Sequence, residues 1–218
     1  MEYKVSEIFT SINGEGERAG EPAVFVRLAG CPLRCSYCDT GYALSFDSEH
    51  TLMTEDEIAE HILSTGITDV TLTGGEPLAA KGIRVLLGRL AQLPVRVEIE
   101  TSGCIDVSIC RGIVPAPVLT IDYKLPSSGM ESRMLKDNYR GLSKDDTVKF
   151  VAGSREDLDR ALEVMREFAL DCHIHISPVW GKIHPQEIVE YMLENRLNGV
   201  KLQLQLHKIV WDADKRGV

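Results

Sequence analysis

Long apolar runs and an excess of positive charge are both missing from this chain of 218 residues. No stretch approaches the ~18 apolar residues that a membrane-spanning helix requires. The formal net charge of −9 also argues against a nucleic-acid-binding protein, because affinity for a phosphate backbone needs a basic surface. The first residues have no basic segment followed by an apolar stretch, which is the pattern of a secretory signal. We therefore expect a cytoplasmic protein that has neither a membrane nor a nucleic acid as its partner.

Repeats, linkers and low-complexity segments are absent as well, and aromatic residues make up only 6% of the chain. Apolar residues nevertheless account for 44% and charged residues for 26%, which is the profile of a globular protein and not of a disordered one. A chain of 218 residues can bury a core of ordinary size within one domain. We expect a single domain over residues 1–218.

The six cysteines are not spaced as a disulfide framework would be. Three of them crowd into residues 31–38, and the others stand alone at positions 104, 110 and 172. Disulfides are rare in a reducing cytosol, where such a cluster is more typical of metal binding. We interpret the three scattered cysteines as buried thiols.

Short apolar or β-branched runs alternate with helical patterns along the chain. We expect strands at residues 23–28, 70–73, 95–99, 118–121, 148–151, 173–176 and 200–204. Thr54 and Glu57 form a capping box that predicts a helix to about Ser64. Ser154 is expected to cap another helix, and Pro185 suits a first helical turn. Residues 126–144 are irregular and predict a long loop.

This alternation predicts an α/β fold in which helices cover a parallel sheet. The number of units indicates a partial (β/α) barrel of about six parallel strands, fewer than the full eight. Catalytic residues in such folds collect at the carboxyl ends of the strands. The cysteine segment, Gly74-Gly75, residues 101–103 and residues 122–124 each follow a strand directly. We expect them to converge at one mouth.

Cys31, Cys35 and Cys38 form a C-x3-C-x2-C pattern in the loop after the first of these strands. Three thiolates in one loop can hold three irons of a [4Fe–4S] cluster. The fourth iron is then open to a chelating substrate, as catalytic metal sites require. The alternative is a zinc knuckle, but structural zinc takes four ligands and only His50 could be the fourth. We favour the iron–sulfur cluster.

Two further motifs accompany the triad. Tyr37 is an aromatic residue directly before its last cysteine, and Gly74-Gly-Glu-Pro77 follows the next expected strand. Together these features resemble the radical S-adenosylmethionine superfamily over residues 22–180. Residues 11–16, 38–40, 100–103 and 205–208 further resemble the 7-carboxy-7-deazaguanine synthase family, and they occur in that family's order along nearly the whole chain.

The resemblance implies an enzyme that converts 6-carboxy-5,6,7,8-tetrahydropterin to 7-carboxy-7-deazaguanine with loss of ammonia, in queuosine and deazapurine biosynthesis. It implies a [4Fe–4S] cluster, S-adenosyl-L-methionine and Mg²⁺ as cofactors, and a small-molecule pterin as substrate. We expect an N-terminal substrate-binding segment at 1–22, a cluster loop at 30–40 and a C-terminal extension at 205–218. The sequence leaves open the electron donor, such as a flavodoxin or a ferredoxin, and whether the protein is a homodimer.

The resemblance also implies a role for individual residues. The cluster ligands are Cys31, Cys35 and Cys38, and Thr40 is the Mg²⁺ ligand. The residues expected to contact S-adenosylmethionine are Tyr37, Cys38, Asp39, Gly74, Gly75, Glu76, Gly103, Asp122, Tyr123, Lys124 and Ser177. The residues expected to hold the substrate are Ile12, Asn13, Gly14, Arg27 and Thr101.

The chemistry of several residues suits these roles. Arg27 offers a bidentate fork for the substrate carboxylate. Glu15 can accept hydrogen bonds from the amino-pyrimidinone edge of a pterin. Thr40 provides the hard oxygen that Mg²⁺ prefers. Otherwise Arg27 would be a surface residue at a strand edge, and Glu15 and Thr40 would be ordinary loop residues.

The end of the chain carries a separate hypothesis. Ile209, Val210 and Trp211 form an apolar group just before the last residues. We expect Trp211 to dock this tail, so that the carboxylate of Val218 reaches the substrate beside His207. The alternative is a frayed terminus that does not contact the site.

Two other functions remain as alternatives. One is a small radical activase that abstracts hydrogen from a glycine of a partner enzyme, which would share the triad but need no pterin pocket. The other is a non-enzymatic metal-binding module.

Overall fold

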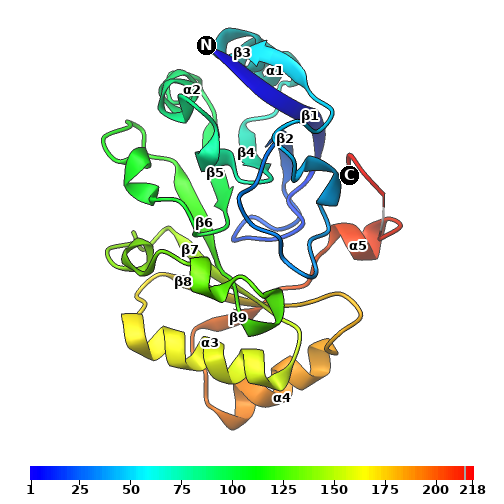
Figure 1. Ribbon diagram of the computed structural model, residues 1–218, viewed down its shortest axis with the longest axis vertical. Helices are drawn as coiled ribbons and strands as arrows, with labels where there is room; N and C mark the ends of the chain where they lie inside the picture. Colours follow the sequence, from blue (N-terminus) through cyan, green and yellow to red (C-terminus); the bar gives the residue numbers. More distant parts are fainter. Residues whose placement is uncertain (214) are drawn as a thin grey trace.

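The computed structural model describes residues 1–213 and 215–218, and it is built on a nine-stranded sheet. The strands are β1 (Glu2–Ile12), β2 (Pro22–Leu28), β3 (Thr51–Thr54), β4 (Asp69–Gly74), β5 (Arg96–Thr101), β6 (Val118–Tyr123), β7 (Thr147–Ala152), β8 (His173–Pro178) and β9 (Val200–Leu202). Their order across the sheet is β3-β1-β2-β4-β5-β6-β7-β8-β9 (Figure 1). Each neighbouring pair from β2 through β9 is parallel, whereas β1 is antiparallel to both β2 and β3.

The predicted α/β fold is confirmed, and it takes the form of an open, mostly parallel sheet. The seven runs expected from the sequence all form strands of the parallel part, which is one strand more than the estimate of about six. Two strands, β1 and β3, were not predicted. Many residues in both are polar, and β1 buries little besides Tyr3 and Val5. Their pairing with each other and with β2 therefore had no strong local signal.

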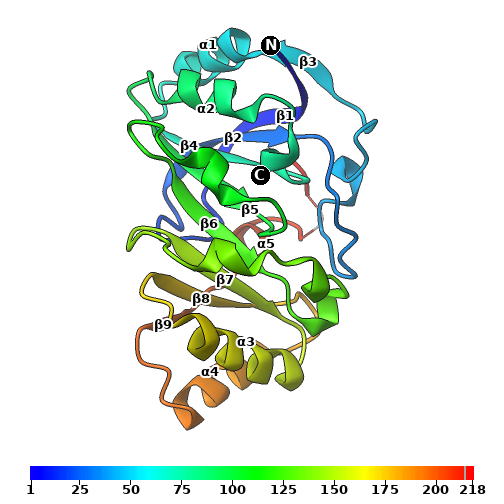
Figure 2. The same cartoon turned by 60° about the vertical axis from the view of Figure 1, so that its left-hand side comes forward.

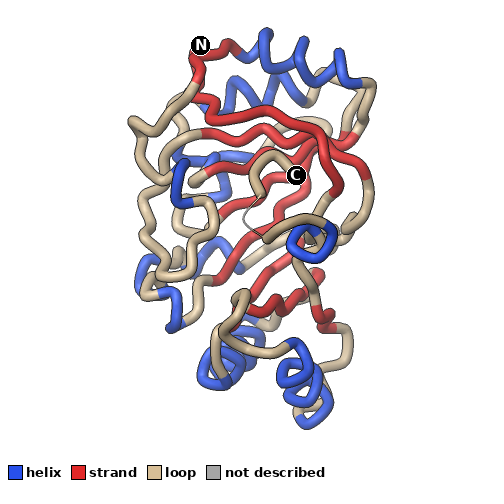
Figure 3. Tube along the Cα trace, turned by 90° about the vertical axis from the view of Figure 1, so that its right-hand side faces the viewer, coloured by secondary structure: helices blue, strands red, loops and turns tan. Residues whose placement is uncertain are grey.

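Helices cover one face of this sheet, as Figure 2 shows for α1 to α4. The helices are α1 (Glu55–Thr65), α2 (Ile83–Leu90), α3 (Arg155–Phe168), α4 (Pro185–Glu194) and α5 (His207–Val210). The short helix α5 and the C-terminal tail lie across the opposite face (Figure 3). Within the predicted loop 126–144 there are three 3-10 turns, at Pro126–Ser128, Glu131–Arg133 and Lys136–Tyr139. No helix in the described part of the chain is long and apolar enough to cross a membrane.

The predicted helix starts are confirmed. The side chain of Thr54 accepts a hydrogen bond from the backbone amide of Glu57, and the Glu57 carboxylate accepts from the Thr54 amide, which completes the capping box. Ser154 caps α3 by accepting from the amide of Asp157. Pro185 occupies the first turn of α4. Each cap satisfies amides that the first turn of a helix leaves without partners.

The core lies between the helices and the face of the sheet that they cover. Val70 and Leu72 of β4 pack with Ile62 of α1, and Phe150 of β7 packs with Leu158 of α3. Side chains alternate between the two faces of a strand, so the intervening residues point to the other face. Those residues are polar and still buried; they include Thr71, Thr73, Glu98, Thr120, Lys149, His175 and Ser177.

The polar face is covered in part by the β1–β2 loop, residues 13–21. Asn13 accepts a hydrogen bond from the Thr71 hydroxyl at 2.8 Å. Glu17 accepts from His175 of β8 at 2.7 Å, several strands away on the same face. One loop therefore contacts strands as far apart as β4 and β8, and the carboxyl ends of the strands are left to line a cavity.

Candidate active site at the carboxyl ends of the strands

A cavity of about 1070 Å³ lies at this edge of the sheet, between the β1–β2 loop, the cluster loop 30–40 and the C-terminal segment 205–218. Most of the predicted site residues line it. They are Ile12, Gly14, Glu15, Arg27, Cys31, Cys35, Tyr37, Cys38, Asp39, Thr40, Gly74, Gly75, Thr101, Asp122, Lys124, His207 and Val218. Segments from both ends and the middle of the chain thus meet at one place, as the sequence predicts.

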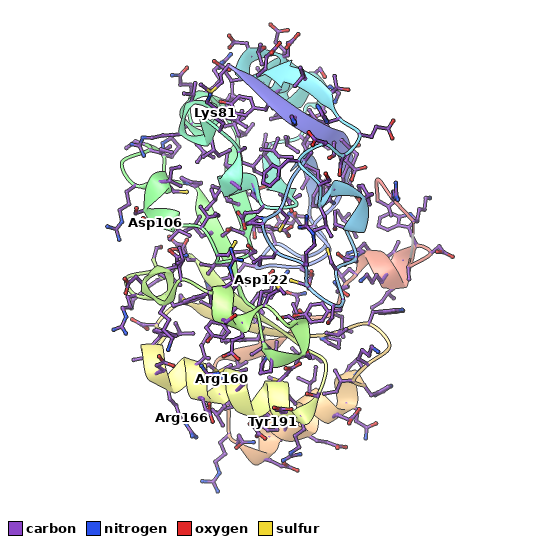
Figure 4. All side chains as sticks on the ribbon, viewed as in Figure 1. Lys81, Asp106, Asp122, Arg160, Arg166 and Tyr191 are labelled. Atoms are coloured by element: carbon purple, nitrogen blue, oxygen red, sulfur yellow. The ribbon has the colours of Figure 1, made fainter. Side chains whose placement is uncertain are left out.

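Five predicted site residues do not line the cavity: Asn13, Glu76, Gly103, Tyr123 and Ser177. Asn13 is held by Thr71 on the polar face. The Tyr123 ring packs against Tyr139 and Phe150, toward the helices. In Figure 4 the neighbouring residue Asp122 lies at the centre of the molecule, whereas Arg160 of α3 is below it. Binding roles for these five residues stay predictions.

The cluster loop runs from the protein interior to the open cavity. Cys31 is buried, Cys35 is half-buried and Cys38 is exposed. Burial raises the pKa of the Cys31 thiol to about 11 and raises that of Cys35 as well. A bound metal reverses this preference, because ligating thiols lose their protons. Three thiols that open on one cavity fit a [4Fe–4S] cluster in which three irons are each held by a different cysteine and the fourth iron has no protein ligand.

A single metal ion fits this arrangement less well. Within residues 1–213 and 215–218, no three His, Cys, Asp or Glu side chains gather as ligands of one ion. Zinc draws all of its ligands around one centre, so the zinc alternative finds no ligand set in that part of the chain.

The glycine motif packs directly on the backbone that leads into the cluster loop. A Cβ atom on Gly74 would lie 2.2 Å from the Leu28 carbonyl oxygen, and one on Gly75 would lie 2.5 Å from that of Gly30. The amide of Gly75 donates to the Leu28 carbonyl at 3.0 Å, and that of Glu76 donates to Gly30 at 2.8 Å. Only glycine permits this approach, so the motif fixes the cluster loop against β4.

Glu76 and Gly103 tie the neighbouring strand ends together. The buried Glu76 carboxylate accepts from the Thr101 hydroxyl at 2.8 Å and from the Ser102 amide at 2.7 Å. Gly103 has a φ of +78°, and its carbonyl accepts from the Asn138 side chain at 3.0 Å. Both residues therefore shape the end of β5 from behind the cavity wall.

Positively and negatively charged side chains alternate along the floor of the cavity. Lys124 donates to Asp122 at 2.6 Å, and Lys149 lies 3.5 Å from the other oxygen of Asp122 and 3.3 Å from Glu15. Burial alone would raise the pKa of Asp122, but Lys124 and then Lys149 outweigh it and hold the pKa below its usual range. Asp122 is therefore ionised at neutral pH.

Two residues of this floor were missed in the sequence. Lys149 lies between Val148 and Phe150, and a lone lysine within a buried strand is the signal that could have identified it. Glu100 accepts from the Thr73 hydroxyl at 2.9 Å, and burial raises the pKa of its carboxyl group. In the sequence, Glu100 was identified only as the first residue of the motif at 100–103 and had no role of its own.

Arg27 reaches the cavity from β2. Its Nε donates to Glu7 at 2.7 Å, and the Tyr42 hydroxyl donates to the same carboxylate at 2.6 Å. The guanidinium also lies over the rings of Phe9 and Tyr42. Arg27 is therefore held in place by contacts on several sides and is not the loose surface residue of the alternative interpretation.

Asp39 and Thr40 connect the cluster loop to the C-terminal segment. The Thr40 hydroxyl donates to one oxygen of Asp39 at 3.1 Å, and Lys208 donates to the other at 3.0 Å. Burial would raise the pKa of Asp39, but Lys208 lowers it to about 2. A carboxylate that is ionised at neutral pH therefore lies beside the Thr40 oxygen.

The C-terminal segment returns to the cavity, and a contact that the sequence did not predict helps to hold it there. Trp211 is half-buried, whereas Ile209 and Val210 are each 57% exposed, so docking of the tail by Trp211 stays a prediction. The guanidinium of Arg216 lies 4.0 Å from the centre of the Tyr42 ring. The cation–π contact brings the last residues to the wall of the cavity.

His207 also holds this segment against the β1–β2 loop. The Leu206 amide donates to the Gly14 carbonyl at 3.0 Å, and a Cβ atom on Gly14 would lie 2.3 Å from Nδ1 of His207. Gly14 is thus required by the close approach of the imidazole ring. His207 and Val218 line the same cavity as predicted, whereas contact of either with substrate stays a prediction.

Comparison with known proteins agrees with this geometry. Residues 26–191 match the Radical SAM superfamily. The chain is 50% identical to 7-carboxy-7-deazaguanine synthase of Clostridium acetobutylicum, with both chains covered completely. It is 39% identical to the enzyme of the same name from Chlorobaculum tepidum, over 98% of this chain and 96% of the relative.

Solved structures share the fold. QueE from Escherichia coli matches with a TM-score of 0.74 over 94% of each chain, at 23% identity. Streptococcus suis SuiB, solved with S-adenosylmethionine, matches with a TM-score of 0.55 and 16% identity, over 80% of this chain and 48% of SuiB. With its cysteine triad, its glycine motif and these relatives, the chain belongs to the radical SAM superfamily and, within it, to the 7-carboxy-7-deazaguanine synthase family.

Proposed function

We propose that this protein converts 6-carboxy-5,6,7,8-tetrahydropterin to 7-carboxy-7-deazaguanine with loss of ammonia; its relatives are named for the formation of this product. The observation that carries the proposal is the shared cavity. The cluster cysteines, the glycine motif, the β1–β2 loop and the C-terminal segment are far apart in the sequence, yet they line one space. A metal-binding module would need only the first of these, and an activase would need no pocket for a pterin.

Membership of the radical SAM superfamily implies a [4Fe–4S] cluster and S-adenosylmethionine. When bound, these groups supply the 5′-deoxyadenosyl radical that removes a hydrogen atom from the substrate. Cys31, Cys35 and Cys38 would hold the cluster. Asp122 and Lys124 present an ionised carboxylate and an ammonium group to the cavity, which suits the charged methionine end of the cofactor.

Arg27 and Glu15 would orient the substrate between them. Because Glu7 fixes Nε of Arg27, the guanidinium is already positioned for a carboxylate. Glu15 is an acceptor for the N–H groups of the amino-pyrimidinone ring. Such orientation brings the reacting carbon near the radical and removes the entropy cost of a chance encounter. The β1–β2 loop and the C-terminal segment limit the access of water.

Mg²⁺ belongs to the proposal as well. Thr40 supplies a neutral oxygen, and the ionised Asp39 lies beside it. Mg²⁺ binds through few protein ligands and keeps several waters, so one hydroxyl together with oxygens of the substrate is a sufficient site.

The remaining assignments concern the whole chain. We propose that residues 1–218 act as one domain, with substrate binding by segment 1–22, the cluster in loop 30–40 and closure by extension 205–218. All six cysteines lie in the described part of the chain and are free of disulfides, which supports a reducing compartment such as the cytoplasm. The cluster needs an external electron donor such as a flavodoxin or a ferredoxin. A homodimer remains an additional proposal for solution measurement.

Anaerobic assay of the reconstituted protein tests the reaction directly. The carboxypterin, S-adenosylmethionine, Mg²⁺ and a chemical reductant are supplied, and the deazaguanine product and ammonia are measured. We expect product only when every component is present. Cofactor cleavage without any deazaguanine product would contradict the proposal, and hydrogen abstraction from a glycyl-enzyme partner would favour the activase.

A further inference from the structure

Glu15 is a loop residue whose carboxylate is nevertheless held from two strands. One oxygen accepts from the Ser177 hydroxyl of β8 at 3.0 Å, and the other accepts from Lys149 of β7 at 3.3 Å. Its side chain is 11% exposed and lines the cavity. A loop backbone alone would not fix a carboxylate this well, so the two strands define where it points.

Ser177 is fully buried and does not line the cavity. Family resemblance predicts a contact with S-adenosylmethionine, but the hydroxyl donates its one hydrogen to Glu15. That hydrogen is then not available to a cofactor. The geometry of Ser177 therefore favours a role at the substrate end of the site.

Lys149 lies between the two ends of the site. It is 8% exposed, and its ammonium group is 3.3 Å from Glu15 and 3.5 Å from Asp122. Burial would lower the pKa of Lys149, but Asp122 and Glu15 raise it well above its usual range. The ammonium group of Lys149 thus lies between Glu15, which we propose binds the pterin, and Asp122, which we propose binds the cofactor.

We propose that Ser177 and Lys149 are positioning residues that hold the Glu15 carboxylate ready for the adjacent N–H donors of an amino-pyrimidinone ring, with Lys149 linking this acceptor to Asp122. Each carboxylate oxygen has two lone pairs and uses one on its strand partner. The second lone pair of each oxygen remains for the substrate, so the carboxylate can accept two hydrogen bonds in parallel. This inference rests on the proposed function, since it assumes that Glu15 receives the pterin.

Ser177→Ala is the sharper test, because the change is small and removes one hydroxyl. The dissociation constants of 6-carboxytetrahydropterin and of S-adenosylmethionine are measured by anaerobic calorimetry on the holoenzyme with Mg²⁺. We expect pterin binding to weaken about tenfold, which is the lower end of the loss expected for one hydrogen bond to a charged group, while cofactor binding stays unaltered. Weaker cofactor binding with normal pterin binding would show that Ser177 contacts the cofactor, and this result would overturn the proposal.

Lys149→Met tests the linking charge, with Lys149→Arg as the variant that keeps it. We expect Lys149→Met to weaken the binding of both ligands at least tenfold, and Lys149→Arg to restore part of each. Lys136→Met is the matched control, since Lys136 is an exposed lysine that pairs with Glu167 outside the cavity. If Lys149→Met loses pterin binding but keeps normal cofactor binding, the proposed link from Lys149 to Asp122 is wrong.

Glu15→Gln shows whether both residues act through Glu15. In that background Ser177→Ala and Lys149→Met should weaken pterin binding no further, because contacting residues are not additive. Full additivity would identify a general structural effect and contradict the proposal. A different result would reject the proposed function itself: the wild-type protein would bind the pterin but form no product. Unaltered pterin binding in Glu15→Gln would instead reject the role of Glu15.

Discussion

The two faces of the sheet use alternate residues of the same strands for opposite purposes. On β7, Val148 and Phe150 are fully buried against the helices, whereas Lys149 points to the cavity and carries a charge. On β6, Ile121 packs toward the helices and Asp122 toward the cavity. Stability is thus concentrated on one face and chemistry on the other. Substitutions at adjacent positions should therefore have separable effects, and the following predictions test that separation.

The largest effect is expected in the cluster loop. Cys38→Ala should abolish both cluster assembly and cleavage of S-adenosylmethionine, because each thiolate ligates one iron. Iron content, the EPR signal of the reduced cluster and 5′-deoxyadenosine formation measure this. Cys172→Ala is the control, since Cys172 lies outside the cavity and should retain all three signals. A Cys38→Ala protein that cleaves the cofactor at the wild-type rate would refute the cluster assignment.

A large effect of the opposite kind is expected on the helix-covered face. Phe150→Ala should lower the free energy of unfolding by about 3–5 kcal/mol, because it leaves a cavity in the core. Denaturant titration measures this loss. The folded fraction should still bind the cofactor, since Phe150 does not line the cavity. A small loss of stability with a complete loss of cofactor binding would show that the two faces are not separable.

The metal proposed at Thr40 predicts a more limited effect. Thr40→Ala should raise the Mg²⁺ concentration for half-maximal turnover about tenfold, which corresponds to roughly 1.4 kcal/mol of binding. Thr40→Ser keeps the oxygen and should stay near wild type. The cluster should remain intact in both variants. A Mg²⁺ titration unchanged by Thr40→Ala would remove this residue from the metal site.

The smallest effect is expected at the end of the chain. A C-terminal tag, or removal of Gly217 and Val218, should raise the Michaelis constant for the carboxypterin several-fold, because charge-assisted hydrogen bonds to the substrate are lost. An N-terminal tag is the control. Cluster content should not change. Identical kinetics for the tagged and native proteins would leave the tail with a packing role only.

Local patterns explain which features of the fold and site were predictable. The capping box at Thr54, the proline at 185, the cysteine triad and the glycine motif are each encoded within a few residues. They gave the helix starts, the confirmed fold class and the confirmed family. The cavity then contained most of the residues that the resemblance implied.

Features that depend on distant pairing were missed or misplaced. Strand β1 has few buried residues, and its register is set by β2 and β3. Glu15 and Ser177 are 162 positions apart, and nothing near either residue indicates the other. The apolar group at 209–211 predicted an anchor for the tail, but nothing in the sequence indicated the contact between Arg216 and the Tyr42 ring, which only the folded chain creates. Sequence motifs identified the residues at the site but not how they are held.

The β1–β2 loop also bridges the sheet, whose edge strands β3 and β9 are not paired with each other in the described part of the chain. Arg18 pairs with Asp69 of β4, while Glu17 pairs with Lys201 of β9. Two adjacent residues of one loop thereby contact two strands that are far apart in the sheet. A residue inserted between them would shift one ion pair out of register and let the strand ends spread. We therefore expect the length of this loop to limit how far β4 and β9 can move apart.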